Sequence, residues 1–546
     1  MTVAADRGAR RRLDPDLEGA RAQAREANVI PVTRRFIDDL ETPVSAFLKL
    51  RAALGGGPSF LLESAEQGRL GRYSFLGFRP HVVLGWTDGV LKEWTGAAIA
   101  AAGHGGPEAW GEPATRVDAP DPYAAVADYL GRYELAAAEL PPFAGGAVGY
   151  FGYDLVRAIE PLGPPNPDPL GLPDMSLMLC ELLVAFDHQR HEVTMVGYAF
   201  VDEEGIDPAY ARATTLIEAA QSALHDPVPR RANPFADPAA PGREAEEAAG
   251  MDSGAGAGDV AGVDSGAEFR SNMTREQFEA NVSRIIEYIR AGDAFQVVPS
   301  QRFSAPAPVE AFSIYRGLRT INPSPYMYYL EFGDFQIAGA SPEPLVKVSG
   351  RRAETRPIAG TYPRGPNEDE DRRRAERLLA DPKERAEHVM LVDLGRNDLG
   401  RVCEYGSVSV DELMVVETYS HVLHIVSQVS GRLREGVTAM DALRAVLPAG
   451  TLSGAPKVRA MQIIDELEPV KRCSYGGAVG YLSFTGDLDT AIHIRTVVVK
   501  DGTIHIQAGG GTVVDAKPDY EYEESVSKAK AIFQAVKLAA SQPEWP

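Results

Sequence analysis

Cysteine is scarce in this sequence: Cys180, Cys403 and Cys473 are the only three among 546 residues. They stand far apart and form no CxxC or metal-ligand spacing, which argues against a disulfide framework and a zinc site. Long apolar runs are missing too, because no stretch reaches the length that crosses a membrane and the Ala/Arg-rich start lacks the apolar core of a signal peptide. Interspersed acidic residues also argue against a transit peptide. We therefore expect a cytoplasmic protein with a disordered tail at residues 1–27.

Basic residues are outnumbered by acidic residues. The chain has 55 Lys and Arg against 77 Asp and Glu, a formal net charge of −22, and no long basic run. Such a surface repels nucleic acid and anionic membranes, so neither is an expected partner. The hydrophobic content of 44% and charged content of 24% are those of an ordinary soluble protein with more than one layered core.

Residues 226–268 are dominated by Pro, Gly, Ala, Asp and Glu and offer almost nothing that could pack against a core. We predict a disordered insert there. It divides an N-terminal lobe at residues 28–225 from a C-terminal lobe at residues 270–540. Short apolar runs broken by Gly and Pro predict strands in the N-terminal lobe, at residues 60–62, 81–84, 146–150 and 192–196.

The C-terminal lobe begins with a well-marked helix. Thr274 and Gln277 have capping-box spacing, an apolar stripe follows, and Gly292 can end the helix. Later elements are predicted strands at 294–303, 415–429, 476–484, 492–500 and 503–508 and a last helix at about 520–538. Strands and helices mixed without regular alternation indicate an α+β fold, with layered mixed or antiparallel sheets flanked by helices.

Two acidic pairs have i, i+3 spacing, which places both carboxylates on one helix face: Glu384 with Glu387, and Glu521 with Glu524. Two such faces opposed would form an oxygen cage. Mg²⁺ prefers hard oxygen ligands and keeps positions open for water and substrate, so this pattern is compatible with a magnesium site.

Each pair also has a purely structural interpretation. Asp381 and Pro382 make a good helix start in which Glu384 can serve as a cap, and Lys528 has the i, i+4 spacing of a salt bridge with Glu524. ExxE on a solvated helix face is common, so spacing alone leaves both interpretations open.

Gly509, Gly510 and Gly511 follow a period-2 strand and lead towards the last helix. Such a loop frees main-chain N–H groups to point at an anion, although a triple glycine is often only a turn. His424 lies in an apolar, strand-like run, where it is either a satisfied core histidine or one with a chemical task. By strand alternation His421 falls on the opposite face, so at most one of the two looks into a given site.

These features belong to an ordered set of motifs that resembles the chorismate-utilising enzymes, and among them the large subunit (component I) of anthranilate synthase. The motifs run through nearly the whole chain; the strongest are GDAFQVVPSQR (292–302), NPSPYMYYL (322–330), ASPEPLV (340–346), RPIAGTYPRG (356–365), ERAEHVMLVDLGRNDLGRV (384–402), GTLSGAPKVRAM (450–461), GGAVGY (476–481), IRTVVV (494–499) and AGGGTVVD (508–515). The resemblance implies a fold of two intertwined lobes.

The resemblance also implies that Glu387 and Glu524 hold Mg²⁺, with Glu384 and Glu521 contributing directly or through water. In the family the metal binds the ring carboxylate of chorismate. A guanidinium fork such as that of Arg495 suits a carboxylate. The positions that match substrate-holding residues of the family are Thr451, Tyr475, Arg495, Lys528, Gly509, Gly510, Gly511, Gly360 and Thr361.

The chemistry implied by the resemblance is addition of ammonia at ring carbon 2 as the 4-hydroxyl leaves, followed by elimination of pyruvate. Glu343 matches the general acid for the departing hydroxyl, His424 matches the histidine associated with the elimination, and Thr451 stands with them as a catalytic candidate. Relatives that make aminodeoxychorismate have a nucleophilic lysine where this chain has Ala359. Relatives that add water have a lysine where this chain has Gln296, so neither chemistry is favoured.

A regulatory site is implied where the two lobes meet. Glu63 and Ser64 end a segment that resembles the tryptophan-inhibition motif of the family, which Pro325, Tyr326 and Met327 complete from the other lobe. L-Tryptophan bound at such a seam can shift the orientation of the lobes and so inhibit the enzyme.

The chain shows no glutaminase region, so we expect ammonia to come from a separate glutamine amidotransferase subunit or from solution. The expected assembly is a hetero-oligomer, either a heterodimer or a heterotetramer. The alternatives are an aminodeoxychorismate or aminodeoxyisochorismate synthase, and a non-catalytic tryptophan-binding regulator, which would be expected to have lost the carboxylates or site glycines that are present here.

Overall fold

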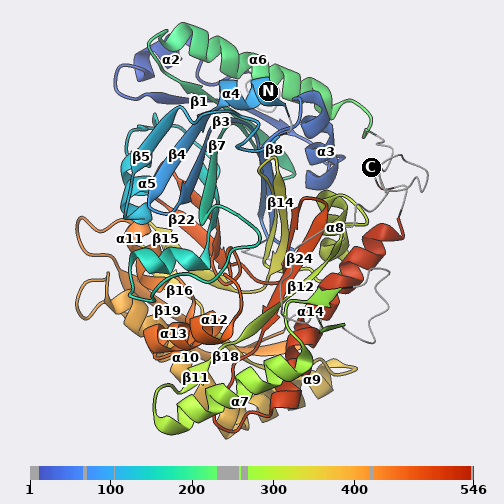
Figure 1. The fold of residues 1–546 in the computed structure, drawn as a ribbon. Coiled ribbons are helices and arrows are strands. Elements are labelled where there is room, and N and C mark those ends of the chain that lie inside the picture. The colour runs from blue at the N-terminus through green and yellow to red at the C-terminus, as the bar shows by residue number, and fades with distance from the viewer. Residues whose placement is uncertain are drawn as a thin grey trace.

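The computed structural model describes residues 12–65, 71–103, 105–229, 258–259, 269–418, 422–542 and 545. Most of the insert predicted at 226–268 lies outside these residues. None of the described helices is long and apolar enough to cross a membrane. Strands occupy the middle of the molecule, with α2, α3 and α6 at one end and α7, α9 and α10 at the other (Figure 1).

The N-terminal segment contributes eight long or short strands and the helices that cover them. Its strands are β1 (Val29–Ile37), β2 (Ser59–Glu63), β3 (Tyr73–Thr87), β4 (Val90–Thr95), β5 (Thr115–Asp118), β6 (Gly146–Phe151), β7 (Met175–Asp187) and β8 (Glu192–Phe200). Its helices are α2 (Leu17–Gln23), α3 (Pro43–Ala53), α4 (Gly96–Ala102), α5 (Pro122–Leu130), α6 (Ile206–Leu224) and the 3-10 helix η1 (Tyr153–Ala158).

The later part of the chain completes the fold. Its strands are β9 (Gly258–Asp259), β10 (Arg270–Ser271), β11 (Gln296–Val297), β12 (Ser300–Pro306), β13 (Tyr326–Glu331), β14 (Phe335–Ser341), β15 (Pro344–Ser349), β16 (Arg352–Thr355), β17 (Ile358–Pro363), β18 (Ser409–Thr418), β19 (Val422–Arg432), β20 (Gly454–Ala455), β21 (Ala478–Ser483), β22 (Leu488–Ile492), β23 (Thr496–Lys500) and β24 (Thr503–Gly509). Its helices are α7 (Arg275–Ala291), α8 (Ala311–Ile321), α9 (Glu368–Ala380), α10 (Pro382–Gly400), α11 (Ala439–Val446), α12 (Gly450–Ser453), α13 (Lys457–Leu467) and α14 (Pro518–Ala540).

The two predicted lobes interlock through their strands. β2 pairs with β13 and β6 pairs with β21, so 22 strands form one connected, antiparallel network. The core is shared as well, because Phe47 of α3 stacks on Phe312 of α8 with ring centroids 4.8 Å apart. The predicted α+β class with antiparallel sheets and flanking helices is confirmed.

The prediction of a disordered tail at residues 1–27 is wrong for the last part of that segment. Asp16 caps α2 by accepting a hydrogen bond from the Gly19 main chain, and Ala20 is fully buried in the largest core cluster. Small alanines gave no apolar stripe in the sequence, yet they allow this helix to pack closely against α6.

Predicted helix starts are confirmed in detail. Thr274 and Gln277 form the capping box of α7, and Gly292 ends that helix in the left-handed conformation with φ 89°. Three predicted strands were too long. Pro299, which has no N–H to donate, separates β11 from β12, and Val415–Val429 spans the end of β18 and most of β19. In the third case Arg495, with φ 53°, breaks the run between β22 and β23.

Candidate active site

A cavity of about 660 Å³ lies where β17, β19 and β24 meet α10, α12 and α14. Its volume is that of a typical site for a small molecule. All four predicted metal-binding carboxylates line it, as do Glu343, His424, Thr451, Gly360, Tyr475, Arg495, Lys528 and the three glycines 509–511. The cavity therefore gathers candidates that are up to about 190 residues apart in the sequence.

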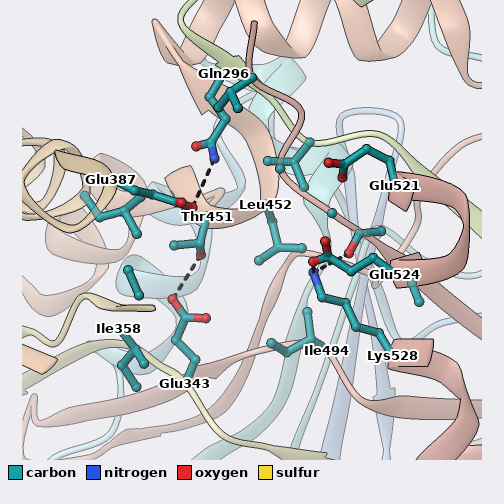
Figure 2. Close-up of a pocket in the computed structure, with 18 of the residues that line it drawn as sticks. Gln296, Glu343, Ile358, Glu387, Thr451, Leu452, Ile494, Glu521, Glu524 and Lys528 are labelled. Carbon is teal, nitrogen blue, oxygen red and sulfur yellow. Dashed lines mark hydrogen bonds and ion pairs between the residues drawn. The ribbon is translucent and has the colours of Figure 1, made fainter. Parts of the chain in front are cut away.

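The carboxylates form two opposing walls. Figure 2 shows Glu387 on one side of the cavity and Glu521 with Glu524 on the other. The side chain of Asp381 caps α10 by accepting hydrogen bonds from the Lys383 and Glu384 main chains, so the predicted cap is present. Because Asp381 satisfies these donors itself, the Glu384 carboxylate remains available to the cavity.

Burial and like charge act together on these walls. Burial, and then the neighbouring Glu387, raise the pKa of Glu384 above its ordinary value. Burial, followed by the charge of Glu524, raises the pKa of Glu521 to about 7. One carboxylate oxygen of Glu521 is buried and forms no hydrogen bond with any described residue. Uncompensated negative charge of this kind favours a bound cation.

The donor set fits Mg²⁺ in chemistry, since all four side chains offer hard oxygen ligands. Gly510 keeps the space between them open, because a Cβ atom there would lie 3.2 Å from a Glu521 oxygen and 3.3 Å from a Glu524 oxygen. Within the described part of the chain, however, no three Asp, Glu, His or Cys side chains are arranged to hold a metal ion by themselves. The two walls thus supply ligands of the right type without a preformed cage.

Glu343 is a half-buried carboxyl that lines the cavity. It follows β14, and the Thr451 hydroxyl on α12 donates a hydrogen bond of 3.0 Å to it (Figure 2). Burial raises the pKa of Glu343 to about 7, although the Thr451 hydrogen bond opposes the shift. A carboxyl whose pKa lies near neutrality can give a proton and take it back, which a general acid requires.

A bulge in β17 orients His424. The pairing of β17 with β19 shifts register between Ala359 and Thr361, and Gly360 between them has φ 67°. The Gly360 carbonyl accepts a hydrogen bond of 3.0 Å from Nδ1 of His424, so Nδ1 carries the proton. Burial lowers the pKa of His424, which keeps the imidazole neutral. Thr361 is paired with His424 through the main chain, and His421 lies outside the described residues.

Close packing against the main chain requires glycine at position 509 of the glycine loop, whereas at position 511 the near neighbour is the end of a flexible side chain. A Cβ on Gly509 would lie 2.1 Å from the Pro299 carbonyl oxygen, and one on Gly511 would lie 2.4 Å from the Gln296 amide nitrogen. Lys528 donates to the Gly509 carbonyl at 2.9 Å and also forms the predicted i, i+4 ion pair with Glu524 at 2.7 Å. Its amino group therefore fixes the loop to α14.

Arg495 and Tyr475 complete the polar lining. The left-handed conformation of Arg495 breaks the strand run, and its guanidinium donates 2.9 Å to the Lys528 carbonyl. Backbone strain of this kind costs of the order of 1–3 kcal/mol and is retained where it positions a functional group. Burial lowers the pKa of Arg495 and raises that of Tyr475 to about 12. Tyr475 thus keeps its hydroxyl proton, and the guanidinium of Arg495 has several N–H groups, so both side chains can donate hydrogen bonds to an anionic ligand.

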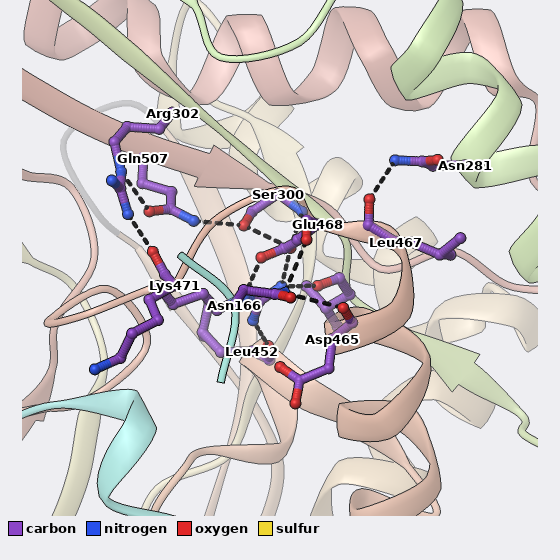
Figure 3. Close-up of polar contacts among 12 residues, drawn as sticks. Asn166, Asn281, Ser300, Arg302, Leu452, Asp465, Leu467, Glu468, Lys471 and Gln507 are labelled. Carbon is purple, nitrogen blue, oxygen red and sulfur yellow. Dashed lines mark hydrogen bonds and ion pairs between the residues drawn. The ribbon is translucent and has the colours of Figure 1, made fainter. Parts of the chain in front are cut away.

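A buried ion pair behind the cavity was missed by sequence reasoning. Glu468 accepts hydrogen bonds from the Ser300 main chain and hydroxyl, both at 2.8 Å, and from Arg472 at 2.9 and 2.5 Å. Arg472 also donates to the carbonyls of Leu452 and Val298, each at 2.6 Å. Figure 3 labels Ser300, Glu468 and Leu452 of this network, together with Gln507 and Lys471. Because Leu452 and Val298 line the cavity, the pair fixes two of its walls. Glu468 lies just beyond α13, so helix periodicity gave no signal for it.

The predicted regulatory segments lie side by side. β2 and β13 pair so that Glu63 is opposite Met327. The buried Glu63 carboxylate accepts a hydrogen bond from the Tyr315 hydroxyl and forms an ion pair of 3.3 Å with Arg319. Next to it, the Ser64 hydroxyl oxygen is buried and has no hydrogen-bond partner among the described residues.

The remaining two positions of this group are also enclosed. Pro325 is buried, and the hydroxyl of Tyr326 donates 3.0 Å to Asp489. The main-chain N–H of Ala65 donates to the Ser324 carbonyl, which ties the two segments together beyond the strand pairing. All five predicted residues thus stand at the junction of the N-terminal and C-terminal segments.

Comparison with known proteins agrees with this geometry. A family model described as chorismate binding enzyme matches residues 113–534. Anthranilate synthase component 1 of Pseudomonas putida is 47% identical over 523 residues, covering 94% of this chain and 96% of the relative. Anthranilate synthase component I from Streptococcus pneumoniae superposes with a TM-score of 0.69 and 37% identity, covering 86% of this chain and 93% of that chain. The menaquinone-specific isochorismate synthase from Escherichia coli, at 17% identity, shares the fold, with a TM-score of 0.63 and coverage of 95% and 98%. The chain therefore belongs to the chorismate-binding enzyme family.

Proposed function

We propose that this chain is the large subunit of anthranilate synthase, which converts chorismate and ammonia to anthranilate and pyruvate at the first committed step of L-tryptophan biosynthesis. The observation that carries the proposal is the placement of a carboxyl with pKa about 7, Glu343, and a neutral imidazole, His424, on one cavity with two carboxylate walls. The names of the most similar relatives support it.

The residues divide the work of two proton transfers. Glu343, held by Thr451, gives its proton to the departing 4-hydroxyl as ammonia adds at ring carbon 2. His424, with Nδ1 fixed on the Gly360 carbonyl, serves the later elimination of pyruvate. The guanidinium of Arg495 and the main-chain N–H groups of the glycine loop bind the substrate carboxylates.

Mg²⁺ would be held by Glu387 and Glu524, with Glu384 and Glu521 beside it. When bound, the ion supplies positive charge that neutralises the ring carboxylate of the substrate. The orphaned oxygen of Glu521 and its raised pKa support this role, because a divalent cation removes the repulsion between the carboxylates.

Two cavity positions argue against the alternative chemistries. Ala359 and Gln296 both line the cavity and neither can act as a lysine nucleophile or base. An aminodeoxychorismate synthase and a water-adding synthase are thereby disfavoured. A non-catalytic regulator has no need of the carboxylates and site glycines that this cavity retains.

Ammonia comes from a separate glutamine amidotransferase subunit in a hetero-oligomer, or from solution. L-Tryptophan binds at the junction of β2 and β13, where the Ser64 hydroxyl has no hydrogen-bond partner in the described part of the chain. A ligand there contacts both segments and so can change their relative position.

The test is anthranilate fluorescence from the purified chain with chorismate, Mg²⁺ and an ammonium salt at mildly alkaline pH. We expect a signal that EDTA abolishes and L-tryptophan reduces. Loss of chorismate without anthranilate would overturn the proposal and indicate an aminated or hydroxylated product. A signal that L-tryptophan leaves unchanged would overturn the regulatory site alone.

A further inference from the structure

A second, much smaller cavity lies directly behind the active cavity. Its volume is about 20 Å³, which is enough for one molecule the size of water. Tyr475 and Gln507 line both cavities and form the wall between them. Half-exposed Leu170 and His505 line the small cavity as well, so it extends from near the surface towards the reacting centre. We refer to it as the rear cavity.

His493 is the unusual residue of the rear cavity. It is only 2% exposed, and neither ring nitrogen forms a hydrogen bond with any residue that the structure describes. Its main chain is held firmly, because its N–H donates to the Gly477 carbonyl at 2.8 Å and its carbonyl accepts from Gly476 at 3.0 Å. A buried polar group without a partner costs about 1–3 kcal/mol, so a ring held in this way indicates a ligand that satisfies it.

The charge of the rear cavity selects a neutral ligand. Arg302 and Arg472 line it, and none of its described lining residues is acidic. Burial lowers the pKa of His493 to about 3 and that of His505 to about 4, so both rings are neutral near pH 7. Arg472 is paired with Glu468, and none of the described lining residues offers a carboxylate that could hold a cation, whereas the volume of about 20 Å³ admits only a molecule the size of water. What fits is one small neutral molecule that both donates and accepts hydrogen bonds, and water and ammonia share this chemistry.

We propose that the rear cavity holds ammonia on its way to the active cavity, with His493 as its hydrogen-bond partner and Tyr475 and Gln507 as the boundary that it crosses. This inference rests on the proposed function, in which ammonia is the co-substrate. A neutral imidazole offers one acceptor and one donor, and ammonia can engage both. Because the rear cavity does not accommodate a charged ligand, ammonia within it stays unprotonated and therefore nucleophilic.

The experiment uses the chain in complex with its glutamine amidotransferase subunit. Anthranilate formation is measured once with glutamine and once with ammonium sulfate, together with glutamate release. We expect His493→Leu to lower the glutamine-dependent rate about tenfold, the effect of losing one buried hydrogen bond, while the ammonium-dependent rate changes less than about twofold because dissolved ammonia enters the open active cavity directly. Glutamate release should then exceed anthranilate formation.

Two further variants distinguish a role of the rear cavity from a general effect of the substitution. Val498→Leu narrows the rear cavity from β23 at a position that does not line the active cavity, and it should uncouple the two rates in the same way. His81→Leu, a matched exchange near the remote α6, should leave the ratio of the two rates unchanged. An unchanged ratio in both rear-cavity variants, or an equal fall of both rates, would show that the cavity holds only structural water and overturn the inference. Absence of ammonium-dependent anthranilate from the parent chain would instead overturn the proposed function.

Discussion

Glu468 and Glu521 are equally buried, each 6% exposed, yet their surroundings are opposite. Glu468 accepts four hydrogen bonds, two from Ser300 and two from Arg472. Glu521 faces another carboxylate, Glu524, and keeps one oxygen without a partner among the described residues. Equal burial therefore serves two purposes. Around Glu468 a complete hydrogen-bond network fixes the walls of the active cavity. Around Glu521 the hydrogen-bond network is incomplete, and such a carboxylate is suited to binding a cation.

The largest expected effect comes from breaking the completed network. Arg472→Met should destabilise the chain by about 3–5 kcal/mol, because Glu468 then remains buried without its cation. The measurement is the free energy of unfolding in urea. The double variant Arg472→Met, Glu468→Leu should recover much of the loss, since apolar side chains can replace a buried ion pair. A single variant as stable as the parent would contradict the structural role of the pair.

Glu343→Gln should reduce the rate of anthranilate formation by about 100- to 10,000-fold, the range for removal of a general acid. Its stability should change little, since the amide can still accept the Thr451 hydrogen bond. In the parent chain, the rate per unit of unprotonated ammonia should fall as the pH rises above about 7, because Glu343 then loses its proton. A rate that keeps this pH dependence in Glu343→Gln would assign the acid to another residue.

Glu521→Gln should stabilise the metal-free chain at pH 8. The folded state raises the Glu521 pKa from 4.5 to about 7, so it binds the proton more tightly than the unfolded state does. The contribution of Glu521 to stability is thus largest below pH 4.5 and is lost as the pH rises through 7, a change of about 1–2 kcal/mol once water in the cavity is considered. Thermal unfolding from pH 5 to 8 would measure this.

Magnesium provides the companion measurement. Added Mg²⁺ should raise the unfolding temperature of the parent at pH 8, because binding to the folded state alone stabilises it. The double variant Glu521→Gln, Glu524→Gln should lose this shift. A shift that persists there would place the metal away from the α14 wall.

Ser64→Ala should give the smallest change in stability, within about 0.5 kcal/mol, because its buried hydroxyl forms no hydrogen bond with any residue that the structure describes. The same exchange should weaken inhibition by L-tryptophan about tenfold or more, as expected when a ligand loses a buried hydrogen bond. Inhibition curves for the parent and the variant would measure this. Unchanged inhibition would separate the orphaned hydroxyl from the regulatory site.

Local signals were predicted well from the sequence. The capping box of Thr274 and Gln277, the end of α7 at Gly292 and the Asp381 cap all appear in the structure. The i, i+3 spacing of the glutamates placed each pair on one helix face, and the metal and substrate assignments came from family motifs. Both kinds of information are contained in short stretches of chain, where propensity and side-chain spacing act.

Features that depend on distant segments were not predicted. The left-handed Arg495, the Gly360 bulge that fixes His424 and the unpartnered ring of His493 gave no signal in their own neighbourhoods. Helix α2 was mistaken for disorder because its alanines pack against a helix almost 190 residues later.

The sequence by itself determined where α7 begins and ends, where α10 begins, which carboxylates share a helix face and which family the motifs resemble. Tertiary structure decided that α10 and α14 face each other across one cavity, that Glu343 and Glu521 have pKa values near 7, and that Glu468 is neutralised by Arg472. The physical reason is that spacing and capping act within a few residues. Burial and electrostatics instead depend on which distant segments meet, and a pKa follows from that environment rather than from the residue type.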